Sequence, residues 1–170
     1  MNMLLASQAA AQFGSLFVYL MASVWHVNPW LRKLTRADAL IVLLWVHVFR
    51  YVALQTYSAQ HAGFPISNAG LTDIVLGDVG GAIIAFLAIA LLQFRSRLGV
   101  PLAYVLVAET AYDTVMNVQG GMKEHLLGAA SGPTWFILAF YVPAVVVTMV
   151  LIAWQLVSRF GKALDSRIAA

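Results

Sequence analysis

Five long apolar segments, separated by short polar connections, constrain the fold of this chain more than any other feature. Each is close to the ~20 residues that an α-helix needs to cross the hydrocarbon of a bilayer. Only 10% of the 170 residues are charged, whereas a soluble domain carries roughly 25%. We therefore predict an all-α, polytopic membrane bundle with five transmembrane helices. The predicted spans are about 4–26, 38–59, 70–94, 98–120 and 133–158.

Turn-forming and capping residues separate the predicted spans. Asn28-Pro29 is expected to end the first span, and Thr35 with Asp38 forms an N-terminal capping pattern for the second. Gly120-Gly121 is expected to end the fourth. Because no polar stretch is long enough to form another domain, residues 1–170 are predicted to be a single transmembrane domain.

Basic residues gather in alternate connections, and this pattern predicts the orientation. They lie in the first and third connections and after the last span: Arg32, Lys33, Arg36, Arg95, Arg97, Arg159, Lys162 and Arg167. The second connection has none, and the fourth has only Lys123. Because cytoplasmic loops carry an excess of Lys and Arg, we expect the N-terminus outside and the C-terminus inside. The net charge of +3 then reflects topology, and no nucleic-acid partner is expected.

Ionisable residues inside the predicted spans are the strongest indication of a function. Glu109, Asp113 and Asn117 recur every fourth residue, so they form one stripe along a helix. His47 and Arg50 lie near the middle of the second span. A charge at this depth costs about 2.5–3.5 kcal/mol on insertion scales, so such residues usually face partners inside the bundle.

Four of these residues are predicted to be catalytic: His47, Glu109, Asp113 and Asp78. Asp73 and Asp78 lie roughly 140° apart around a helix, and the deeper Asp78 is the better candidate. If both faced inward, four carboxylates would share Arg50 and not all could ionise cheaply, which suits acid–base chemistry. In the alternative interpretation, Glu109 or Asp113 pairs with Arg50 and only holds two helices together.

The residues expected to contact a substrate come from all five spans. They are Arg50, Asn117, Asp73, Tyr141 and Gln12. With the predicted orientation, the polar side chains lie in the outer half of the membrane, and the inner half is nearly pure hydrocarbon. This asymmetry predicts a cavity that is entered from outside or from the outer leaflet.

No cofactor and no metal site are predicted. The chain has no cysteine, which excludes disulfides, iron–sulfur ligation and thiolate catalysis. His61 and His125 match no metal-binding spacing and are interpreted as solvated loop residues. Only His47 lies in the middle of a span, so a haem held by two histidines is not expected.

Five motifs follow one another between about residues 46 and 158. They are Arg50, Gly63-Phe64-Pro65, Gly70-Leu71-Thr72-Asp73-Ile74-Val75-Leu76-Gly77, Glu109 with Asp113, and Phe140-Tyr141-Val142-Pro143. In this order they resemble a family of small uncharacterised bacterial integral membrane proteins. The resemblance implies a multi-pass protein of the bacterial inner membrane, with Arg50, Asp73 and Asp113 in one constellation, and it implies no activity. Glu109 stands where that family often has Asn, and Trp154 stands where His is common.

The favoured hypothesis is a site inside the membrane that binds or converts a hydrophobic small molecule. Conversion would be acid–base chemistry of the isomerase, hydratase or cyclase type, with His47 or Glu109 as base and Asp113 or Asp78 as acid. One alternative is a proton- or cation-coupled transporter or channel, which ranks lower because the inner half lacks polar residues. Another is a non-catalytic subunit of a larger membrane complex. Whether the chain is an enzyme, and in which oligomeric state it works, stays open at this point.

Overall fold

The computed structural model describes residues 3–166, and every regular element in that range is helical. In chain order these are α1 (Met3–Ala22), η1 (Ser23–Val27), α2 (Asn28–Lys33), α3 (Arg36–Val48), η2 (Phe49–Leu54), α4 (Gln55–His61), α5 (Asn68–Gln93), α6 (Gly99–Lys123), α7 (Gly132–Phe136), η3 (Ile137–Tyr141) and α8 (Val142–Ser158). Several of them join end to end into longer helices. Arg167, used above for orientation, lies outside the described residues.

Within residues 3–166, four continuous helices are long and apolar enough to cross a membrane. They are Met3–Lys33, Arg36–His61, Asn68–Gln93 and Gly132–Ser158. These helices indicate a multi-pass membrane protein. The 25-residue helix α6 has a comparable length but is less apolar, because Glu109, Asp113 and Asn117 lie within it.

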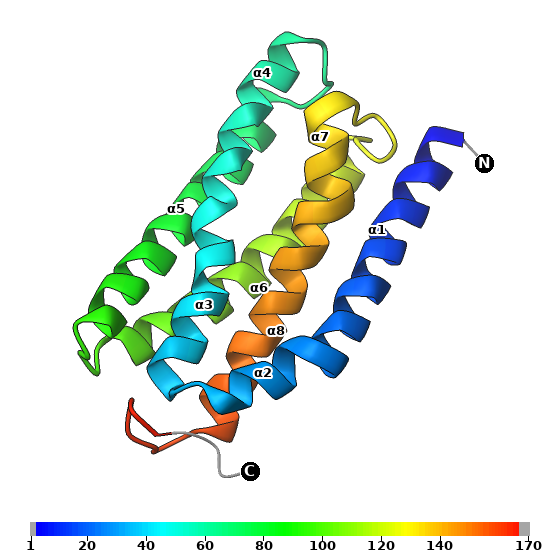
Figure 1. Cartoon of the computed structure of the whole chain (residues 1–170). Helices are drawn as coiled ribbons and strands as arrows, with labels where there is room; N and C mark the ends of the chain where they lie inside the picture. The colour runs from blue at the N-terminus through cyan, green and yellow to red at the C-terminus, as the bar shows by residue number, and fades with distance from the viewer. Residues whose placement is uncertain (1–2, 167–170) are drawn as a thin grey trace.

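Helices α3, α5, α6 and α8 form a bundle, and α1 packs on its outside (Figure 1). Helix α5 lies against α3 and α6, while α8 lies against α3, α6 and α1. Two apolar cores follow one another along the bundle. The larger core includes Leu40, Leu92 and Leu106, and the smaller one, toward the α4 end, includes Leu71 and Leu126.

The first helix does not stop at Asn28-Pro29 but continues to Lys33. A proline inside a helix lacks an N–H donor and clashes with the carbonyl four residues before it. The π-helical turn η1 lies immediately before this point, and such local adjustment lets membrane helices accommodate proline. The π-helical turn η3 precedes Pro143 in the same way. The helix end predicted at Asn28-Pro29 is therefore wrong, because the π-helical turn η1 lets the helix continue through the proline.

The capping pattern predicted at the start of the second helix is confirmed. The Thr35 hydroxyl accepts a hydrogen bond from the Asp38 backbone N–H at 3.2 Å and donates one to the Asp38 carboxylate at 2.6 Å. This arrangement satisfies a free N–H in the first turn of α3. It also sets the start of the helix that carries Arg50 in its middle.

Candidate functional site

Arg50 is the centre of the site, and its side chain is only 1% exposed. Its guanidinium forms ion pairs with Asp78 at 2.8 Å, Glu109 at 2.6 Å and Asp113 at 2.7 Å. It also donates to the Thr110 hydroxyl at 2.9 Å. Five hydrogen bonds leave the guanidinium, which matches its five N–H donors. We call these five residues the Arg50 cluster.

The Arg50 cluster joins three helices near their midpoints. Arg50 lies in η2, a 3-10 turn between α3 and α4, Asp78 comes from α5, and Glu109 and Asp113 come from α6. The stripe predicted on α6 continues to Asn117, whose amide donates to Asp113 at 3.1 Å. A 3-10 stretch within a helix often marks a functional or strained position. The cluster separates the two apolar cores along α5.

The carboxylates of the cluster outnumber its cation. One positive and three negative groups leave a formal charge of −2 when all of them are ionised. The side chains of Asp78, Glu109 and Asp113 are 24%, 22% and 12% exposed, so the carboxylates and not the guanidinium form the accessible side. Such a group has the composition to bind a proton.

Two glycines of α5 allow the charged groups to approach its backbone. A Cβ atom at Gly77 would collide with the Asp113 carboxylate, and one at Gly81 would collide with the Arg50 guanidinium. The four-residue spacing of Gly77 and Gly81 is typical of close helix contacts in membranes, and it predicts a packing seam on α5. That the seam faces the charged side chains of the cluster is evident only in the folded bundle.

His47 is fully buried but belongs to a different contact. Its Nε2 atom lies 3.2 Å from the Thr148 hydroxyl of α8. Among residues 3–166, its Nδ1 atom has no hydrogen-bond partner, and no hydrogen bond joins His47 to a carboxylate. His47 therefore lacks the carboxylate partner that orients the histidine base of a catalytic triad.

Three other residues predicted to contact a substrate, Tyr141, Gln12 and Asp73, form no hydrogen bond or ion pair with the Arg50 cluster in residues 3–166. The Tyr141 hydroxyl donates to the Val46 carbonyl at 2.7 Å, and the Gln12 amide donates to the Leu138 carbonyl at 3.1 Å, which ties α1 to η3. Asp73 is exposed and is not brought to Arg50. The constellation implied by the family resemblance is thus wrong for Asp73, because the helical turn between the two aspartates directs Asp78 toward Arg50 instead.

The sequence of this chain matches one protein family, described as a domain of unknown function, over residues 8–157. The chain belongs to the DUF8737 family. Membership confirms the expectation of an uncharacterised family. No curated protein and no solved structure matches the chain. The matched region contains every member of the Arg50 cluster.

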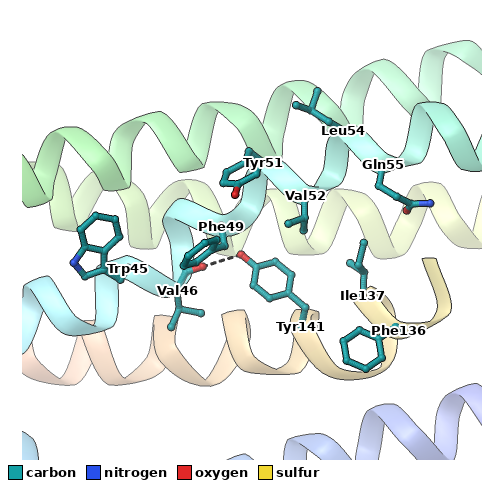
Figure 2. Close-up of a pocket in the computed structure, with 10 residues that line it drawn as sticks. All are labelled: Trp45, Val46, Phe49, Tyr51, Val52, Leu54, Gln55, Phe136, Ile137 and Tyr141. Atoms are coloured by element: carbon teal, nitrogen blue, oxygen red, sulfur yellow. Dashed lines mark hydrogen bonds between the residues drawn. The ribbon is translucent and has the colours of Figure 1, made fainter. Parts of the chain in front are cut away.

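A groove of about 900 Å³ runs along this DUF8737 bundle between η2 and the α7–η3 segment (Figure 2). Its walls are formed by Trp45, Val46, Phe49, Tyr51, Val52, Leu54, Gln55, Phe136, Ile137 and Tyr141. Figure 2 shows the Tyr141 hydroxyl directed at the Val46 backbone, on the α3–η2 side of the groove. Arg50 itself lies in η2 between two residues of the groove wall, Phe49 and Tyr51. The groove therefore runs beside the helical segment that carries the cation of the Arg50 cluster.

The half of the bundle that holds the C-terminal end of α8 is not the pure hydrocarbon that was predicted. Thr148, Gln155 and Arg159 follow one another at spacings of seven and four residues, which places them on one helix face. Gln155 and Arg159 are fully buried. This spacing was the signal that could have revealed the polar stripe from sequence, but the high mean hydropathy of α8 concealed it.

Glu124, just beyond α6, holds the opposite end of the bundle together. Its carboxylate accepts hydrogen bonds from the Ser67 backbone N–H at 2.7 Å and from the Ser67 hydroxyl at 2.6 Å. These bonds hold the pKa of Glu124 below its usual range. Because Ser67 caps α5, the contact connects the start of α5 to the end of α6, the two helices that supply the carboxylates of the cluster.

Proposed function

We propose that this DUF8737 protein crosses a bacterial inner membrane five times, with α6 as the additional span and the N-terminus outside. The length of α6 and its packing against α5 and α8 support this topology. The basic residues support the orientation, because Arg32, Lys33, Arg95 and Arg97 are exposed at one end of the bundle. In this orientation the C-terminal end of α8 is the inner end.

We propose that the protein binds a hydrophobic small molecule in the groove between η2 and η3. The observation that carries this proposal is an apolar groove of about 900 Å³ that meets the hydroxyl of Tyr141. Ligand sites typically have such a volume, mostly apolar walls and a few polar groups that orient the ligand. The chemistry of the walls suits a molecule with an apolar body and one hydrogen-bonding group near Tyr141.

Binding fits the geometry better than conversion does. All three carboxylates are held by Arg50, and His47 has no carboxylate to orient it as a base. None of the residues predicted to act as acid or base is among those that line the groove, whereas a general acid or base must lie within hydrogen-bond reach of the substrate. We therefore assign the groove to ligand binding.

Native mass spectrometry of the protein released from nanodiscs tests this proposal. We expect the wild type to retain a small molecule that is not a bulk lipid. Replacing Ile137 with Trp should fill the groove and remove the bound mass, whereas Ile83→Trp, on an exposed part of α5 outside the groove, should leave it in place. A wild-type protein without any such mass, or equal retention by both variants, would contradict the assignment.

A second candidate function is proton translocation, and a specific observation favours it. Polar side chains follow the Arg50 cluster toward the inner end: His47 and Gln155 are buried, and Thr148 is half-buried. No described residue forms a hydrogen bond with His47 Nδ1 or with either amide atom of Gln155, so these atoms are available to water. From the sequence, transport ranked below ligand binding because the inner half was expected to lack polar side chains.

Proton uptake by liposomes that contain the protein and an internal pH-sensitive dye tests this candidate. A potassium gradient with valinomycin would supply the driving force. If protons pass through the cluster, Glu109→Gln should reduce the uptake rate at least tenfold, because it removes an ionisable group from the path. Glu124→Gln, which removes a carboxylate outside the spans, should leave the rate unchanged. Uptake no faster than in empty liposomes would exclude this function.

A further inference from the structure

Two arginines at the inner end of the bundle are buried without an acidic partner. Arg36, at the start of α3, is 6% exposed, and Arg159, directly after α8, is 0% exposed. Within residues 3–166 neither forms an ion pair with a carboxylate. A buried charge is costly unless it is paired and fully hydrogen-bonded. These two residues therefore need a source of negative charge.

The present partners of the two guanidiniums are neutral carbonyl groups. Arg159 donates to the Leu34 carbonyl at 3.1 Å and to the Leu31 carbonyl at 2.8 Å, and Arg36 donates to the Lys162 carbonyl at 2.7 Å. In the described part of the chain, the Nε atoms of both arginines have no hydrogen-bond partner. The carbonyl groups thus accept hydrogen bonds from some of the guanidinium N–H groups, but they do not neutralise the two positive charges.

The two positive charges also act on each other. Burial and the neighbouring charge of Arg36 lower the pKa of the Arg159 guanidinium. The two nearest acidic groups on this side do not relieve the repulsion, because Asp38 and Asp165 face Arg95 at 3.6 Å and 2.9 Å. The positive-inside pattern explains why basic residues occur here, but not why these two are buried.

Gln155 adds a neutral donor on the same face of α8. It lies one helical turn before Arg159 and is fully buried, and neither of its amide atoms has a hydrogen-bond partner among residues 3–166. Leaving a buried amide unpaired is unfavourable, and native structures contain few such groups. An unpaired amide one helical turn from a guanidinium without a counter-charge indicates a missing acceptor.

We infer that Arg36, Arg159 and Gln155 form a binding site for a phosphate group at the inner end of the bundle. The planar N–H donors of arginine match the oxygen geometry of phosphate, and hydrogen bonds to a charged acceptor are stronger than those to a carbonyl. The segment after α8 covers this site, since the carbonyls of Lys162, Leu164 and Ser166 contact Arg36 and Ala37. The phosphate can come from a lipid head group at the inner surface or from a soluble anion. The inference does not depend on the groove.

Thermal unfolding of the full chain in nanodiscs tests the site with two probes. In one arm, inorganic phosphate is titrated at constant ionic strength into nanodiscs of a galactolipid, which has no phosphate group. In the other, phosphatidylglycerol is added to these nanodiscs without soluble phosphate. We expect the midpoint temperature of the wild type to rise in at least one arm, because a ligand that binds only the folded state stabilises it. A rise with phosphate assigns a soluble anion, and a rise with phosphatidylglycerol alone assigns a lipid.

Three variants separate a specific site from general charge screening. Gln155→Leu should fold, since removing an unpaired buried amide is nearly neutral or stabilising, and should weaken apparent phosphate affinity roughly tenfold. Arg36→Gln should abolish the response. Arg32→Gln, which changes an exposed arginine at the same end, should keep it. The inference is overturned if the wild type responds to neither probe, or if Gln155→Leu and Arg36→Gln respond as strongly as Arg32→Gln.

Discussion

Replacing Arg50 with Met is expected to lower the free energy of unfolding by about 3–5 kcal/mol, the usual cost of removing one partner from a buried ion pair. The substitution leaves Asp78, Glu109 and Asp113 close together without their shared cation. Unfolding of the detergent-solubilised protein with increasing sodium dodecyl sulfate would measure the loss. Arg97→Met, at an exposed arginine outside the cluster, should change stability by no more than about 0.5 kcal/mol.

Neutralising the carboxylates tests whether charge causes the loss. A variant that combines Arg50→Met with Asp78→Asn, Glu109→Gln and Asp113→Asn should be more stable than Arg50→Met alone. Replacing a whole buried ionic group is often far less harmful than removing one member. A loss below about 1 kcal/mol in Arg50→Met, within the range of an exposed ion pair, would show that the carboxylates do not depend on Arg50.

Replacing Gly81 with Ala is expected to destabilise the bundle by about 1–3 kcal/mol, the cost of adding a methyl group to a fully packed interior. The new Cβ would collide with the Arg50 guanidinium. The end of an arginine side chain can normally move aside, but this one is held by three carboxylates and Thr110. The added methyl group therefore forces either the ion pairs or the contact between α5 and α6 to open.

Gly80 provides a matched control for Gly81 on the same helix. A Cβ atom at Gly80 would meet nothing within 4 Å. Gly80→Ala should therefore leave stability unchanged or raise it by about 0.5–1 kcal/mol, because alanine is the better helix former. The same unfolding measurement applies to both variants. Equal effects of the two substitutions would refute a specific contact between Gly81 and the cluster.

The Arg50→Met and Gly81→Ala variants both test whether the Arg50 cluster holds its three helices in a fixed arrangement. Its guanidinium is saturated with hydrogen bonds, whereas its carboxylates keep part of their surface exposed. A fixed helix arrangement would keep the neighbouring groove open for a small molecule. Accessible carboxylates would allow the cluster to bind a proton. The bound-mass and proton-uptake measurements distinguish these two functions.

Local patterns in the sequence predicted most of the fold. Helix length and the apolar character of the spans follow from the requirement that a backbone inside a bilayer satisfies its own hydrogen bonds. The stripe formed by Glu109, Asp113 and Asn117 could also be predicted from sequence, because helical periodicity places residues i, i+4 and i+8 on one face. The end assigned to the first helix was wrong, since a proline also fits a continuous helix when a π-helical turn precedes it.

The sequence by itself determined that this chain forms long apolar helices with charged groups in their middle and basic residues at one end. Only the tertiary structure decided which faces of those helices meet. The packing pairs Asp78 rather than Asp73 with Arg50, and it brings the α5 backbone at Gly77 and Gly81 against charged side chains of the cluster. It also directs His47 to Thr148 and buries Gln155 and Arg159. The physical reason is that periodicity defines the faces within one helix, whereas the rotation of each helix toward its neighbours depends on how all their side chains pack together.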